Sequence, residues 1–79
     1  MTIGEKIKNA RNLRGLTQKE LGMKLGFDEK SADVRIAQYE SGTRTPKSEL
    51  LSEIAAVLDV NINFLKNPSL ENTETFIHL

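Results

Sequence analysis

The side chains of this 79-residue chain that can do chemistry are hydrogen-bonding groups rather than reactive ones. The chain has one histidine and no cysteine, no glycine-rich phosphate loop after a strand, and no pair of carboxylates in an expected cleft. The sequence offers too few of the histidine and cysteine side chains that usually bind a metal ion such as zinc. We therefore expect no enzyme, no cofactor, no metal ion and no small-molecule ligand, and the polar side chains are interpreted as a binding surface.

A set of polar and exposed side chains shares one face of a short helix expected near Ile36. The apolar spacing places Ala32, Ile36 and Tyr39 on the inner face of this helix. The residues that point away from the core are Ser31, Val34, Arg35, Gln38 and Ser41. A glutamine can pair in two places with an adenine edge, an arginine with guanine, and a valine can touch a thymine methyl group. This face therefore suits the edges of DNA bases.

The stretch from Thr17 to Gly42 contains the elements that must position this face. Thr17 and Glu20 have the spacing of a capping box, which predicts that a helix begins at this point. Gly26 is placed to end that helix in the left-handed conformation, and Gly42 is placed to end the following one. Two short helices joined at an angle, the second with an exposed polar face, form a helix-turn-helix unit.

The start of the second helix of this unit is open to two interpretations, because Phe27 to Lys30 lengthen the turn. Either Ser31 caps the helix, or Asp28 caps it and the helix gains a turn; both are suitable cap residues. We favour Ser31. Phe27 is expected in the core in both cases.

Two further segments complete the expected bundle. A capping box at Thr2 and Glu5 predicts a first helix that begins at Ile3 and ends at Gly15. Its apolar stripe includes Leu13, while Lys6, Lys8 and Arg14 lie off the stripe, and a solvated face is expected for most of the lysines. The apolar stripe of a later helix, from Ser48 to Leu58, is Leu50, Leu51, Ile54, Ala55 and Leu58.

The end of the chain divides into a last helix and an extension. Asn61 can cap a short final helix, which Pro68 ends. We expect one domain over residues 1–67 and a C-terminal extension over residues 68–79, which either contributes to dimerisation or is a truncated helix. His78 is expected to be an exposed helix residue rather than a ligand.

The ordered set of residues resembles the Cro/CI-type helix-turn-helix family of bacterial and phage repressors, over about residues 3 to 66. The residues that carry the resemblance are Leu13, Gly15, Leu16, Thr17, Gln18, Glu20, Leu21, Leu25, Gly26, Ile36, Tyr39, Glu40, Gly42, Arg44, Pro46, Leu50, Leu51, Ile54, Ala55 and Leu58. The resemblance implies an all-α fold, a compact bundle of about five short helices like that of lambda repressor. The chain departs from the family in about four extra residues near Phe27–Lys30 and in Gly22, where alanine is usual.

The resemblance also implies roles for individual residues. Base contacts in the family match Asp33, Val34 and Gln38, to which the outward face adds Arg35. Asp33 either accepts from a cytosine amino group or favours the helix N-terminus electrostatically. Phosphate contacts are expected from Gln18, Lys19, Ser31, Thr43, Arg44 and Lys47. A partly buried ion pair is expected between Arg11 and Glu40. Dimer contacts are expected from Val60, Ile62, Phe64, Phe76 and Ile77.

The charge is unevenly distributed along the chain. Residues 1–47 hold ten Lys/Arg and six Asp/Glu, giving +4, and residues 48–79 hold one and five, giving −4. The basic half contains the helix-turn-helix, although the net charge of zero argues weakly against nucleic acid. The lack of cysteine is consistent with a reducing cytoplasm, and no apolar run approaches the length of a membrane span.

The leading hypothesis is a cytoplasmic, sequence-specific regulator that binds double-stranded DNA, a repressor that reads an inverted-repeat operator as a homodimer. The alternative is a helix-turn-helix protein-interaction module, similar to an antitoxin or an adaptor, with little DNA affinity. The zero net charge, the insertion and Asp33 near the helix start favour the alternative.

Overall fold

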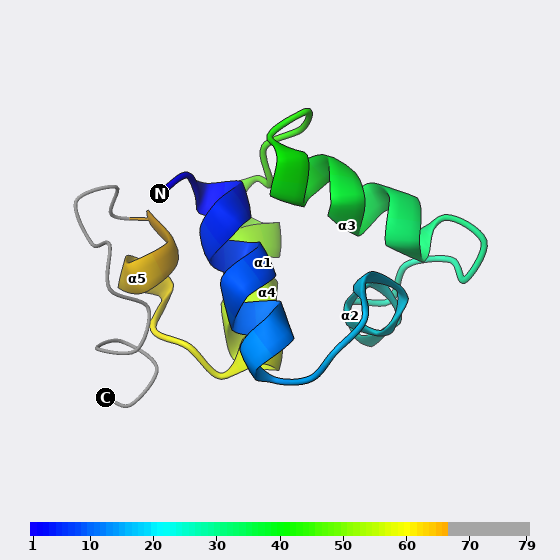
Figure 1. The fold of residues 1–79 in the computed structure, drawn as a ribbon, viewed down its shortest axis with the longest axis horizontal. Coiled ribbons are helices and arrows are strands. Elements are labelled where there is room, and N and C mark those ends of the chain that lie inside the picture. The colour runs from blue at the N-terminus through cyan, green and yellow to red at the C-terminus, as the bar shows by residue number, and fades with distance from the viewer. Residues whose placement is uncertain (67–79) are drawn as a thin grey trace.

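A computed structural model describes residues 1–66, and all regular structure in this range is helical (Figure 1). The helices are α1 (Ile3–Leu13), α2 (Gln18–Lys24), α3 (Ala32–Ser41), α4 (Ser48–Leu58) and α5 (Ile62–Lys66). The prediction of an all-α bundle of about five short helices is confirmed. The expected extension 68–79, with Phe76, Ile77 and His78, lies outside the described residues.

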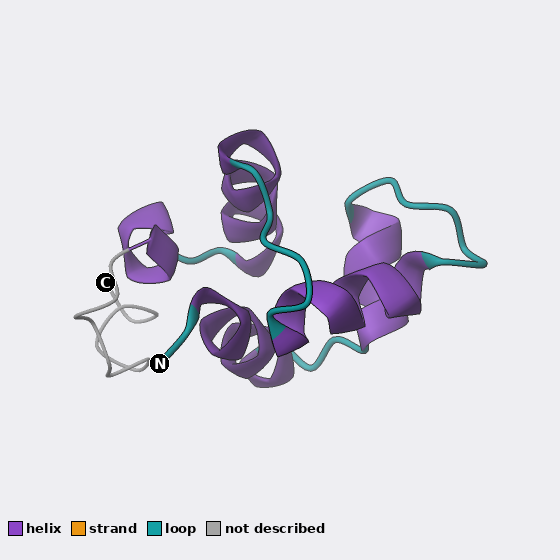
Figure 2. Ribbon diagram, turned by 90° about the horizontal axis from the view of Figure 1, so that it is seen from above, coloured by secondary structure: helices purple, strands orange, loops and turns teal. Residues whose placement is uncertain are grey.

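Helix α1 is the central element of the bundle. It contacts α3 on one side and α4 and α5 on the other, while α2 packs mainly against α3 (Figure 1). The view from above shows the α2–α3 pair extending to one end of the molecule, with the turn between them outermost (Figure 2). The helix-turn-helix thus projects from a base formed by α1, α4 and α5.

The core fills the space between these helices with apolar side chains from all five of them. Its fully buried members include Ile7 of α1, Leu21 of α2, Ile36 of α3, Ile54 of α4 and Phe64 of α5. Burying a side chain of this size contributes about 1.5–3 kcal/mol relative to leaving it exposed. Because each helix supplies at least one such residue, none of the helices can be removed without opening the core.

Helix ends follow the capping signals in the sequence. The Thr2 and Thr17 hydroxyl groups accept the backbone N–H of Glu5 at 3.1 Å and of Glu20 at 3.0 Å. In return, the Glu5 and Glu20 carboxylates each accept the backbone N–H of the threonine at 2.9 Å. These hydrogen bonds lower the pKa of both glutamates. The largest contribution comes from the bonds that the carboxylates accept from the threonine backbone N–H groups. Asn61 directly precedes α5, and its side-chain oxygen accepts the N–H of Asn63 at 2.8 Å.

Two expectations for α1 are wrong. Lys6 was expected in solvent, but it is fully buried, with its Nζ atom 5.5 Å from the centre of the Phe64 ring, because α5 packs over this side of α1. Leu13 was placed on the apolar stripe, but 53% of its surface is exposed, since it occupies the last position of the helix. The contacts of α5 with α1 join positions far apart in sequence, which the periodicity of one helix does not reveal.

Arg14 links the end of α1 to the end of α4. Its Nε donates to the Leu58 carbonyl oxygen at 2.7 Å and its Nη2 to the Asp59 carbonyl oxygen at 2.8 Å. Asp59 ends α4 in the left-handed conformation, at φ 53°. The guanidinium therefore satisfies carbonyl groups that have no partner within their own helix.

Among residues 1–66, none of the helices is long and apolar enough to cross a membrane.

Candidate nucleic-acid interface

Helix α3 presents two contrasting faces. Ala32 and Ile36 are fully buried, and Tyr39 and Glu40 are nearly so. On the other side Val34 is 54% exposed, and Asp33 is also exposed. The helix is therefore held by one face and offers the other to solvent.

Two glycines let neighbouring helices approach α3 at backbone distance. A Cβ atom at Gly22 of α2 would lie 2.7 Å from the Ala32 Cβ and 2.8 Å from the Ala32 carbonyl oxygen. A Cβ atom at Gly4 of α1 would overlap the carbonyl oxygens of Tyr39 and Glu40. One glycine thus fits against each end of α3. The departure at Gly22 from the family's alanine is explained by the close contact with Ala32.

A buried ion pair joins α1 to α3. Arg11 Nε donates to Glu40 Oε2 at 2.6 Å and Arg11 Nη2 donates to Glu40 Oε1 at 3.1 Å, with both residues 7% exposed. Arg11 Nη1 donates to the Leu16 carbonyl oxygen at 2.8 Å, and Gln18 Nε2 donates to Glu40 Oε1 at 3.1 Å. The network connects α1, the start of α2 and the end of α3, and it fixes the angle of α3.

The turn before α3 settles the question of its start. Ser31 precedes the first helical residue, as favoured, but its side chain makes no capping hydrogen bond. Asp28 organises the turn instead: its Oδ1 accepts the Lys30 N–H at 2.9 Å and its carbonyl oxygen accepts the Ser31 N–H at 3.0 Å. The preceding helix ends as expected at Gly26, at φ 88°.

The four residues expected to read bases lie on or beside the outer face of α3. Asp33 and Val34 are exposed, and Gln38 is half-buried. Asp33 Oδ1 accepts the Val34 backbone N–H at 2.9 Å. The Arg35 guanidinium carbon lies 3.6 Å from the centre of the Phe27 ring. Phe27, expected in the core, packs against the core only in part.

The residues expected to contact phosphate flank this face, and four of their side chains already have protein partners. The Ser31 hydroxyl donates to the Asp28 carbonyl oxygen at 3.5 Å, and the Thr43 hydroxyl lies 2.9 Å from that of Ser41. Gln18 donates to Glu40, and the Lys19 Nζ lies 3.2 Å from Glu29 Oε1 in an exposed ion pair. Arg44 and Lys47 are exposed in the loop after α3. The whole predicted phosphate set is Gln18, Lys19, Ser31, Thr43, Arg44 and Lys47.

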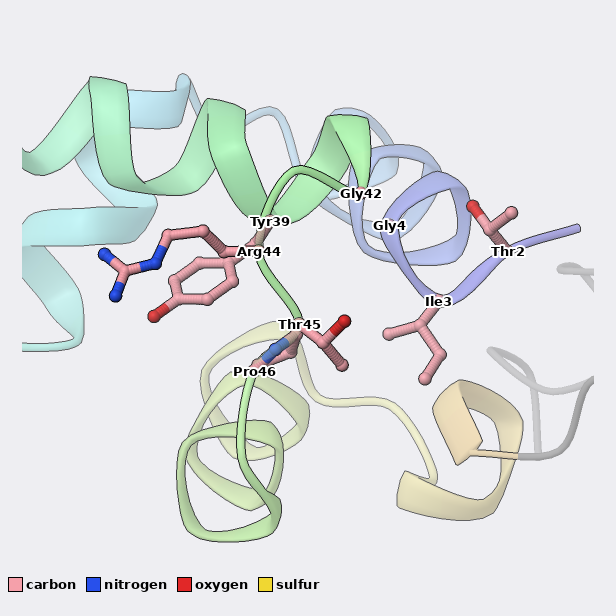
Figure 3. A pocket seen from close by; sticks show the side chains of 8 residues that line it. All are labelled: Thr2, Ile3, Gly4, Tyr39, Gly42, Arg44, Thr45 and Pro46. Carbon is pink, nitrogen blue, oxygen red and sulfur yellow. The ribbon is translucent and has the colours of Figure 1, made fainter.

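The loop after α3 borders a pocket of about 180 Å³ at the N-terminus of α1 (Figure 3). Thr2 and Ile3 line one side of the pocket, and Arg44 and Thr45 line the other. Figure 3 shows the Arg44 side chain extending away from Thr2 and Ile3, toward the Tyr39 side of the loop. The Arg44 backbone N–H donates to the Gln38 carbonyl oxygen at 3.1 Å, which holds the loop against the end of α3.

The expected dimer residues differ in what they offer to a partner. Val60 and Ile62 are half-buried. Phe64 is 0% exposed and belongs to the core of its own chain, so it is withdrawn from the predicted dimer surface. Its burial follows from the packing of α5 on α1 and α4.

Comparison with known proteins adds to this geometry. A family model described as helix-turn-helix matches residues 7–65, most of the chain. The chain belongs to the Cro/CI-type helix-turn-helix family. The fold is also similar to a solved structure described as the crystal structure of transcriptional regulator BswR, with 37% sequence identity and a TM-score of 0.87. The match covers 99% of this chain and 76% of that one. Family and neighbour together support a DNA-binding regulator.

Proposed function

We propose that this chain is a sequence-specific transcriptional regulator, a repressor that binds an inverted-repeat operator in duplex DNA as a homodimer. The observation that carries the proposal is the division of α3 into a fixed inner face and an exposed outer face. A helix held in this way can enter the major groove with its angle already set, while α2 crosses the DNA backbone. The base contacts proposed are Asp33, Val34, Arg35 and Gln38.

The cations beside α3 support a phosphate-binding role. Arg44 and Lys47 lie in the loop that the Gln38 carbonyl group holds at the end of α3, and Lys19 lies in the first turn of α2. Each phosphate neutralised by the protein releases counterions, so log K falls with log salt with a slope of about −0.9 for each contact.

A salt titration of binding to duplex DNA tests these contacts. Arg44→Ala and Lys47→Ala should weaken binding to all sequences about equally, and each should reduce the steepness of the slope by about one. Lys8→Ala is the matched control, because it removes an exposed cation of α1 that we do not place at the interface. If Lys8→Ala reduces the slope as much as Arg44→Ala, the proposed phosphate surface is wrong.

The dimer is proposed from the family resemblance and from the half-buried Val60 and Ile62. Two paired α3 helices would read half-sites about one helical turn apart, ~34 Å. Sedimentation of the chain with a duplex that it selects from a random pool measures the stoichiometry. A one-to-one complex on a site without dyad symmetry would contradict the dimer. Reduced transcription from a promoter that carries the selected site tests the repressor role.

A protein-interaction module with little DNA affinity is the second candidate. It is favoured by exposed acidic groups, Glu29 in the turn and Asp33 in the first turn of α3, at the end of the helix that would approach DNA. The ion pair of Lys19 with Glu29 also neutralises one of the proposed phosphate contacts. Absence of salt-dependent binding to any duplex in the random pool would favour this candidate over the regulator.

A further inference from the structure

The extended turn places an aromatic ring beneath one of the proposed base-reading residues. The Arg35 guanidinium carbon is 3.6 Å from the centre of the Phe27 ring, which is a stacking distance. Phe27 belongs to the turn and Arg35 to the first half of α3. A planar guanidinium that stacks through its face keeps its N–H groups available around its edge.

Phe27 is itself held in place. Its backbone N–H donates to the Gly22 carbonyl oxygen at 2.9 Å, and the Gly26 N–H donates to the Met23 carbonyl oxygen at 3.0 Å. This pair of bonds is the Schellman motif that ends α2. The Phe27 ring also packs partly against the core. The ring is therefore a fixed platform rather than a mobile side chain.

The acidic side chains of the turn and the helix start are engaged away from Arg35. Asp28 accepts the Lys30 N–H, Glu29 pairs with Lys19, and Asp33 accepts the Val34 N–H. Within residues 1–66, the guanidinium of Arg35 has no hydrogen bond and no ion pair. Its charge is thus stacked on a ring while its donors remain available for a ligand.

We propose that Phe27 is a positioning residue that holds the Arg35 guanidinium ready to read one guanine in each half-site of the operator. Guanine presents two acceptors, O6 and N7, in the major groove, and an arginine edge donates to both. Ordering a long side chain opposes binding, and a side chain ordered before binding avoids part of that cost. The proposal rests on the proposed function and adds to it one preferred base and a residue that acts through another.

Base preference measured on a panel of single-base variants of a duplex selected by the wild-type chain tests the proposal. Arg35→Ala should lower the preference for guanine at one position of the half-site by about 5- to 150-fold. Phe27→Leu, which keeps an apolar side chain but removes the ring, should lower that same preference by about two- to fivefold. Phe27→Tyr, which keeps the ring, should leave the preference intact, and Phe27→Leu should have no further effect on base preference in the Arg35→Ala background.

Several results would overturn the proposal. One is uniform weakening of all duplexes by Phe27→Leu, because that result indicates a purely structural role. Another is the absence of any position at which Arg35→Ala changes base preference. In both cases the wild-type chain still binds DNA sequence-specifically, so the proposed function stands. Failure of the wild-type chain to select any duplex removes the proposed function together with this proposal.

A measurement without DNA protects the test against a Phe27 variant that does not fold. In the free wild-type chain, the ring current of Phe27 should shift the NMR signals of the Arg35 side-chain protons upfield. Phe27→Tyr should keep this shift. Arg35 signals at ordinary positions in the wild-type chain would show that the stack does not form in solution, and would overturn the proposal.

Discussion

The inner face of α3 carries Ile36 and Glu40, both buried and both packed or hydrogen-bonded to other helices, whereas its outer face carries Asp33 and Val34 in solvent. A substitution on the inner face disturbs the core or the ion-pair network. A substitution of Asp33 or Val34 on the outer face changes a side chain that lies in solvent. Along ten residues of one helix, the contacts that stabilise the fold and the face proposed for recognition thus lie on opposite sides.

The strongest way to break this division is to remove one member of the buried ion pair. Arg11→Met should destabilise the domain by about 3–5 kcal/mol, because Glu40 would remain as a buried charge with only Gln18 as a hydrogen-bond donor. Lys19→Met is the control, since its ion pair with Glu29 is exposed and contributes about 0–1 kcal/mol. Urea unfolding of both variants gives the free energies.

The coupling within the ion pair can be measured separately. A double-mutant cycle with Arg11→Met and Glu40→Gln should give a coupling energy well above zero, of roughly 0.5–3 kcal/mol for side chains in one network. A coupling energy indistinguishable from zero would mean that the pair does not hold α1 to α3.

A second substitution tests the inner face of α3 by forcing α2 away from it. Gly22→Ala should destabilise the domain by about 1–3 kcal/mol, because the new methyl group meets the Cβ atom and the backbone carbonyl group of Ala32, neither of which can move aside as the end of a flexible side chain would. In an unpacked helix the same change would stabilise by about 1 kcal/mol. The sign of the change in stability, measured by thermal unfolding, therefore distinguishes close packing of α2 on α3 from an unpacked helix. Adding Ala32→Gly should restore only part of the loss, since the carbonyl oxygen at 2.8 Å remains.

A third substitution, of Gln38, tests the outer face of α3, where we expect an effect on DNA binding and little effect on stability. Gln38→Ala should lower affinity for the selected duplex by about 1–3 kcal/mol and relax preference at one base position. Its effect on unfolding should be small, because the contacts that Arg44 and Ser41 make with residue 38 use its backbone carbonyl group. Binding to a single-base panel at two salt concentrations gives the result. If Gln38→Ala weakens binding to every site equally, Gln38 contacts only the DNA backbone and does not read a base.

The smallest expected effect concerns the capping box at the start of α2, where the Glu20 side chain is bonded to Thr17 rather than to α3. The pKa of Glu20 is lowered from 4.5 in the folded chain, so its contribution to stability is present above pH 4.5 and is lost as pH falls through the lower folded-state pKa. The stability difference between the wild-type chain and Glu20→Gln should therefore shrink in acid. Thermal unfolding between neutral pH and about pH 3 measures it, with Glu53→Gln on α4 as the control.

The sequence predicted best those features that depend on neighbours a few residues away. The capping boxes at Thr2 and Thr17 and the left-handed ending at Gly26 need only local spacing, and all three are present. The burial of Lys6 under α5 depends on a distant segment, so the polar character of lysine gave the wrong expectation.

In the candidate interface, too, the sequence predicted local features but not contacts between distant segments. The exposure of Val34 follows from the helical period, whereas Asp33 was expected at the interface from the family resemblance. The stack of Arg35 on Phe27 does not, because it depends on the path of an extended turn whose conformation Asp28 sets through two hydrogen bonds. The pairing of Arg11 with Glu40 was expected from the family resemblance alone, since 29 positions separate the two residues.

The link from Arg14 to the carbonyl groups of Leu58 and Asp59 has a consequence for the order of assembly. The guanidinium lies near the start of the chain and its acceptors lie more than forty positions later. During synthesis from the N-terminus, α1 is therefore complete long before the groups that Arg14 binds have left the ribosome. We expect the last turn of α4 to remain frayed until it docks on α1, so that closure of the bundle is a late and cooperative step of folding.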